Sequence, residues 1–395
     1  MKRTRWWIGI VLLTAVLCAR GAFGEGETEA GAGLPRHLLT SWDKLSSLLT
    51  TASGLLDKQE TLPDKAFFGD DKRSNAKKLD AVRERAIEIL LGGEAIELHR
   101  QAKKLREEIP ALQLKRDDLR NRSISANESD WIPAWIPSWV PGTETRSKIA
   151  GEIAALDREI EADKKLEAET RGRIARALRG MGIGLDDAQI DTLLSSSMDD
   201  DLLQNAALFT NIRHVAEKLA ELSAQDRENL EINLRYAGMY LVLNDLLVYT
   251  QEALLEKIEI DYKPKVAAVR EESQKLREEA LTGARDARFS ERQREAFASN
   301  ARANATTMDA ADLYMKFLDS QADNSRKSLE ELRRNRSLAA NTHRTVRNAS
   351  DLRDVIRSGL AMFDSIQGLS MPAIRPFENE ALRREFEEIG RRLRK

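Results

Sequence analysis

Apolar residues recur every three or four positions along most of the chain, and we find no stretch with the alternating pattern of a strand. Three- and four-residue spacing places apolar side chains on one face of an α-helix, whereas a half-buried strand needs a spacing of two. The pattern therefore predicts an all-α protein without a β-sheet.

Two of the predicted helical stretches carry a seam of alternating four- and three-residue steps, which is typical of coiled coils. We expect the first stretch to weaken at Gly92 and Gly93 and to bend or break at Pro110. Because a loop separates the two seams, they predict a long antiparallel coiled-coil hairpin over residues 76–182, projecting from a helical-bundle core. The same seam could instead pair two copies of the chain. Its positions are Leu98, Ala102, Leu105, Ile109, Leu112, Arg116 and Leu119, then Ile149, Ile153, Leu156 and Ile160.

The turn of this hairpin contains the sequence WIPAWIPSWVP, residues 131–141. Each proline removes a backbone donor and favours extended geometry at the residue before it, so a helix is excluded. If exposed, so much apolar surface would exceed what a soluble monomer usually tolerates. We therefore expect the segment to be covered by its own hairpin, by a protein partner or by lipid headgroups. The candidate contact residues are Trp131, Ile132, Trp135, Ile136, Trp139 and Val140.

A second unusual feature is an acid within the most apolar helical stretch, residues 234–255. Apolar residues cover nearly all faces between Tyr236 and Tyr249, which predicts burial on all sides. Asp245 lies inside this run, and a buried carboxylate is costly without a partner. We therefore expect a basic or hydroxyl side chain beside it. We interpret Asp245 as a structural acid, with a role in a ligand-binding or enzymatic module over residues 183–285 as the alternative.

The patterns divide the chain into successive segments. They are a signal peptide (1–24), a flexible spacer (25–35), an N-terminal helical segment (36–75), the hairpin (76–182), a helical core (183–285), long C-terminal helices (286–371) and a C-terminal amphipathic helix (372–395). The last helix ends in basic residues. We expect it to pack on the core, and docking of a partner or contact with anionic lipid are the alternatives.

The signal peptide is predicted from a basic start, an apolar run from Trp6 to Leu17 and small residues at Ala22 and Gly24. A membrane-spanning helix needs ~20 apolar residues, so an uncleaved inner-membrane anchor is the weaker alternative. Cys18 is the only cysteine and would be removed with the signal. An exported chain without disulfides suits the bacterial periplasm.

Composition and motifs argue against several classes of function. Removal of residues 1–24 would change the formal net charge from −2 to −6, a mild balance that does not favour nucleic acid. The four histidines lie far apart and have no acid or cysteine at ligand spacing, so we predict no metal site. We also find no phosphate-binding loop and no motif of an activated nucleophile. We therefore expect neither a cofactor nor an enzymatic activity.

These observations favour a non-enzymatic periplasmic scaffold or adaptor that binds an envelope protein through the apolar end of its hairpin. One alternative is a peripheral membrane-surface protein that uses the tryptophans of the turn and the basic C-terminal helix. The other is a ligand-binding or enzymatic module within residues 183–285.

Overall fold

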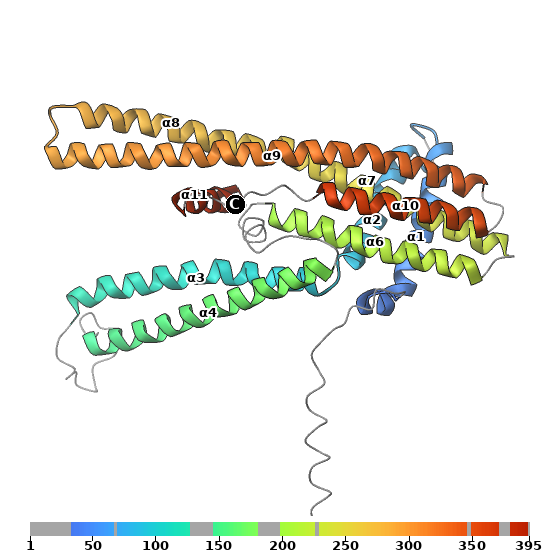
Figure 1. Cartoon of the computed structure of the whole chain (residues 1–395), viewed down its shortest axis with the longest axis horizontal. Coiled ribbons are helices and arrows are strands. Elements are labelled where there is room, and N and C mark those ends of the chain that lie inside the picture. The colour runs from blue at the N-terminus through green and yellow to red at the C-terminus, as the bar shows by residue number, and fades with distance from the viewer. Residues whose placement is uncertain are drawn as a thin grey trace, which may run out of the picture. The chain divides into compact units, whose positions relative to one another are not determined.

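The computed structural model describes residues 33–66, 69–126, 145–180, 198–225, 229–345, 349–370 and 380–393. Within these ranges the regular elements are helices, and no strand is present (Figure 1). The all-α prediction is therefore confirmed for the part of the chain that the structure describes. Among these helices, none combines the length and the apolar character that crossing a membrane requires.

A first hydrophobic cluster is built around one central helix. Its helices are α1 (Arg36–Thr61), α2 (Lys72–Leu90), α6 (Asp199–Gln225), α7 (Leu230–Lys257), the C-terminal part of α9 (Glu291–Thr345) and α10 (Ala349–Ser370). Every residue of α7 from Ala237 to Val248 is buried. The prediction that this helix is covered on all sides is thus confirmed, and it places α7 at the centre of the cluster.

Asp71 caps the start of α2. Its carboxylate accepts a hydrogen bond from the backbone N–H of Ser74 at 2.7 Å, and the Ser74 hydroxyl accepts one from the backbone N–H of Asp71 at 2.9 Å. This reciprocal pair satisfies donors that the first turn of a helix leaves without partners. The helix ends before Gly92 and Gly93, and Gly93 has a φ of 137°, which glycine adopts readily. The predicted interruption at these glycines is confirmed, and it separates α2 from α3 (Glu94–Ser125).

α3 and α4 (Arg146–Gly180) pack side by side as an antiparallel pair, called the α3–α4 hairpin below (Figure 1). At one end, Leu119 of α3 shares a small cluster with Ile149 and Leu156 of α4. At the other end, Leu98 shares a second, larger cluster with Ile174. The buried positions of the predicted seam are Leu98, Ala102, Leu105, Ile109, Leu119, Ile149, Leu156 and Ile160.

The hairpin differs from the expectation at two places. Of the predicted bend or break at Pro110, the break is wrong: α3 continues through this residue, because a single proline removes one hydrogen bond and the turns on either side can continue. The first part of the range 76–182 is α2, which packs against α1 instead of α4. The physical reason is the glycine interruption, which lets the chain change direction and lets Leu79 and Leu90 enter the first cluster.

α7 continues into α8 (Lys263–Arg285) through a π-helical turn, Ile258–Tyr262. Pro264 is the second residue after this turn. Its missing N–H and its ring disturb the regular hydrogen bonds of the preceding turn, and a wider turn accommodates the change. Four residues at four-residue steps along this region are buried in the second cluster, namely Leu254, Ile258, Tyr262 and Val266.

α8 and α9 form another antiparallel pair, joined by a short turn at residues 286–290 (Figure 1). A capping box is present at the start of α9, where the Gln293 side chain accepts from the Ser290 backbone N–H at 2.9 Å. The last helix, α11 (Glu380–Leu393), contacts both α9 and α8. Its Phe386 ring stacks on Tyr314 of α9 with 4.3 Å between centroids. Burial of Phe386, Ile389 and Leu393 shows that the apolar face of α11 is used in packing.

Candidate functional site

Two places in the molecule deserve comparison as functional sites, the loop-side end of the α3–α4 hairpin and the surroundings of Asp245. The first contains the tryptophan segment. Trp131, Ile132, Trp135, Ile136, Trp139 and Val140 all lie outside the described residues. The structure does show what flanks them, because α3 ends at Ser125 and α4 begins at Arg146.

The loop-side end of the hairpin, called the hairpin end below, comprises residues 112–125 of α3, residues 146–156 of α4 and the segment between them. Within the described residues, its apolar cluster of Leu119, Ile149 and Leu156 draws on these two helices. A two-helix contact buries far less apolar area than a bundle does, so this end contributes little of the stability of the fold. Two large apolar side chains stay in solvent here: Leu114 is 73% exposed and Ile124 is 76% exposed.

An ion pair also crosses the hairpin near this end. The Arg116 guanidinium lies 3.4 Å from the Asp157 carboxylate, and it also contacts Asp117 on its own helix. These contacts raise the pKa of Arg116, with the hydrogen bond to Asp117 as the largest cause. Since the acids are about half exposed, the pair fixes the register of the two helices more than it stabilises them.

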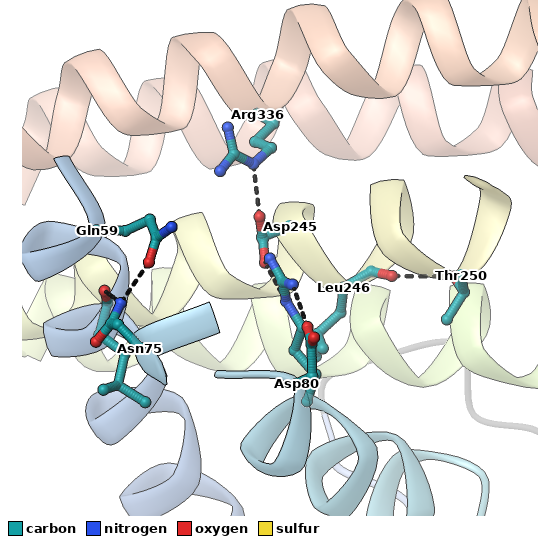
Figure 2. A network of polar contacts seen from close by, with 9 residues as sticks. Gln59, Asn75, Asp80, Asp245, Leu246, Thr250 and Arg336 are labelled. Atoms are coloured by element: carbon teal, nitrogen blue, oxygen red, sulfur yellow. Dashed lines mark hydrogen bonds and ion pairs between the residues drawn. The ribbon is translucent and has the colours of Figure 1, made fainter. Parts of the chain in front are cut away.

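The second place is the buried carboxylate of α7. Asp245 is 3% exposed, and guanidinium groups from two other helices hold it. The Nε of Arg83 on α2 donates to one carboxylate oxygen at 2.8 Å, and the Nε of Arg336 on α9 donates to the other at 2.7 Å (Figure 2). Arg83 also donates to Asp80 at 2.8 Å. The arrangement joins α2, α7 and α9, and it provides the basic partner that a carboxylate in this apolar run requires.

A layer of uncharged polar groups lies beside Asp245. The Asn335 amide of α9 donates to the Asn244 side chain of α7 at 2.5 Å, and Asn244 donates to the Tyr240 carbonyl at 2.8 Å. The neighbouring residues Asn244 and Asp245 thus face the neighbouring residues Asn335 and Arg336. Burial raises the pKa of the Tyr240 hydroxyl. Sequence reasoning missed Asn335 and Arg336, because asparagine and arginine are ordinary residues on an exposed helix face.

A hollow of about 370 Å³ opens next to this carboxylate. It is lined by Arg83, Asp245, Val248, Tyr249, Glu252, Arg333 and Arg336. The Arg83 guanidinium lies over the Tyr249 ring, 5.0 Å from its centroid. Both oxygens of Asp245 are engaged by guanidinium groups, so its carboxylate is better suited to orienting those groups than to taking a proton. The hollow is therefore lined by guanidinium groups whose orientation Asp245 fixes.

Metal-binding chemistry has no support in the described part of the chain, where no group of three or more histidine, cysteine, aspartate or glutamate side chains could hold an ion. The acids at the start of α6 have protein partners instead. Asp200 lies 3.0 Å from the His99 ring, and this contact is the largest cause that lowers the pKa of Asp200. Asp201 accepts hydrogen bonds from Lys257 and from the Tyr262 hydroxyl. These acids connect helices.

Comparison of the chain with protein-family models, with curated proteins and with solved structures gave no match.

Proposed function

We propose that this protein is a non-enzymatic helical scaffold, exported to the periplasm, that binds a protein partner of the cell envelope through the hairpin end. The observation that supports this proposal is the exposure of Leu114 and Ile124 on a two-helix end whose own cluster is small. The proline-rich tryptophan segment connects the same two helices. Large rigid aromatic side chains beside exposed aliphatic ones are typical of the residues that dominate binding energy at protein interfaces.

Charge favours a protein over an anionic membrane as the partner. Residues 123–145 contain no lysine or arginine, whereas segments that bind anionic lipid are rich in both. The basic C-terminal helix gives no support to a membrane role either. Phe386, Ile389 and Leu393 already pack against α8 and α9, so α11 would have to leave this site before it could insert into lipid.

The test uses the full exported chain with substitutions on the described part of the surface. Leu114→Ser and Ile124→Ser together should leave the helical circular dichroism and the unfolding midpoint unchanged, because both side chains are mostly in solvent. The same double variant should capture at least about tenfold less partner in a pull-down from the native envelope, a loss of about 1.4 kcal/mol that two residues at the centre of an interface can account for. Replacement of Trp131, Trp135 and Trp139 by alanine should abolish capture.

A matched control removes apolar surface of the same kind elsewhere. Ile260 and Leu276 are exposed on the π turn and on α8, so Ile260→Ser with Leu276→Ser should capture the partner as the unmodified chain does. Equal loss of capture in this control would contradict the proposal. A large fall in the unfolding midpoint of the triple tryptophan variant would instead show that the segment packs on the protein itself.

A further inference from the structure

The hollow beside Asp245 contains a guanidinium group that is fixed on one edge and free on the other. Arg336 donates through Nε to the Asp245 carboxylate at 2.7 Å. Its two terminal nitrogens make no hydrogen bond to any part of the chain that the structure describes. Figure 2 shows these nitrogens to the left of the Nε that contacts Asp245. Since Arg336 lines the hollow and is 37% exposed, its free edge is accessible to a small molecule.

Asp245, which contacts the opposite edge of the Arg336 guanidinium, determines the orientation of the free edge. Asp245 cannot move toward solvent, because it is buried in the middle of α7 and also accepts two hydrogen bonds from Arg83. The carboxylate therefore holds the Arg336 guanidinium in place before any ligand arrives. Groups that are oriented in advance bind more tightly, because less conformational entropy is lost on binding.

A second arginine extends the site at its rim. Arg333 lies one helical turn before Arg336 on α9, and residues three apart lie on the same face of a helix. Its partner in the hollow is Glu252, at 2.6 Å, and both side chains are about half exposed. An exposed pair of this kind opens at low energetic cost, so Arg333 is available to a ligand.

The charges that line the hollow favour an anion. Three arginines and two acids leave a formal charge of +1 on the lining residues. Arg83 and Asp245 are the more buried of these groups, and the exposed ones, Arg333, Arg336 and Glu252, also sum to a formal charge of +1. Two terminal nitrogens of one guanidinium match the spacing of two oxygens of a carboxylate or a phosphate group.

We propose that this hollow is a binding site for the oxyanion group of a small molecule, a carboxylate or a phosphate, with Arg336 as the bidentate donor and Arg333 as the second cation. The volume of about 370 Å³ is within the range of small-molecule sites, about 300–1,000 Å³. Glu252 and the Tyr249 hydroxyl are polar groups at the same site that would contact the rest of the ligand. This site is independent of the hairpin end.

The test is isothermal titration calorimetry of the full exported chain with sodium acetate and, separately, with inorganic phosphate, at constant ionic strength set with chloride. At least one anion should bind with saturation at one site, with a Kd of about 10 mM or tighter for so small a probe. The anion with the tighter binding identifies the group that the site prefers.

Two variants and one control assign the site. Arg336→Lys keeps a positive charge beside Asp245 but removes the pair of terminal nitrogens, so it should weaken binding at least about tenfold, a change of about 1.4 kcal/mol. Arg333→Gln removes the exposed rim charge without touching Asp245 and should weaken binding several-fold. Arg334→Gln removes a charge from the adjacent residue, which pairs with Glu331 on the surface, and should bind as the unmodified chain does.

Absence of saturable binding by both anions would overturn the proposal. Equal affinity in Arg333→Gln and Arg334→Gln would also overturn it, since the effect would then follow net charge and not the hollow. Arg333 is more than half exposed, so this comparison holds even if Arg336→Lys fails to fold.

Discussion

Replacement of Asp245 by asparagine tests whether the buried carboxylate holds α2, α7 and α9 together. The substitution keeps the size of the side chain but removes the charge that two guanidinium groups share. Breaking a buried pair by removal of one partner costs about 3–5 kcal/mol. Asp245 is 3% exposed and Arg83 is 15% exposed, so most of that cost applies at Arg83. Arg83 retains Asp80 at 2.8 Å, and Arg336, 37% exposed, can be hydrated. We therefore expect Asp245→Asn to lower the free energy of unfolding by about 2–3 kcal/mol.

Urea unfolding followed by circular dichroism at a fixed pH measures this difference. The slope of the free energy against urea should stay the same, because the surface exposed on unfolding does not change. Asp323→Asn is the matched control, since Asp323 pairs with Arg326 on α9 at 2.7 Å but is 67% exposed. It should cost less than about 1 kcal/mol. If Asp245→Asn costs no more than this control, the buried cluster does not stabilise the fold and our interpretation of Asp245 is wrong.

Two further predictions concern packing and pH. Gly359→Ala on α10 should lower the free energy of unfolding by about 1–3 kcal/mol, because a methyl group there would overlap the hydroxyl of buried Tyr240. Gly151→Ala on α4, where no other atom lies within 4 Å of the new methyl group, should raise it by up to ~1 kcal/mol; equal effects of the two in urea unfolding would contradict this. Burial, and secondarily the nearby His214, lowers the pKa of His37 below its ordinary value of 6.5. The folded state then binds fewer protons than the unfolded one, so the contribution of His37 to stability is full above about 6.5 and is lost as the pH falls through the lower folded value. Urea midpoints in a pH series should fall less toward acid in His37→Gln, and an identical fall would contradict the assignment.

Much of the helical structure was predictable, because burial follows local spacing. Leu98, Ala102 and Leu105 are buried as their four- and three-residue steps indicate, since that spacing places them on one helix face whatever the partner is. Pro110 was harder to interpret. The loss of one hydrogen bond is a local cost, and the contacts of a long helix with its neighbour can exceed it.

The candidate sites were harder to predict from the sequence than the helices were. Asp245 was noticeable because an acid in an apolar run is unusual, but its partners are separated from it by 162 and 91 residues. The chain contains 63 lysines and arginines at similar helical spacing, and nothing in the local pattern distinguishes Arg83 and Arg336 from the others. Only the packing of α2 and α9 against α7 selects them.

The π turn between α7 and α8 also determines how the helix pair α8–α9 can evolve. In a regular α-helix each four-residue step advances about 40° around the axis, so the three steps from Leu254 to Val266 would carry the apolar stripe about 120° away from its starting side. The extra residue in the wide turn cancels much of this drift. Loss of one residue between Ile258 and Tyr262 would restore a regular helix and leave α8 at nearly the same rotation, whereas loss of one residue within α8 would rotate the rest of that helix by about 100°. A deletion of one residue in the π turn would therefore preserve the packing of α8 on α9, whereas the same deletion within α8 would disrupt that packing along the rest of the pair.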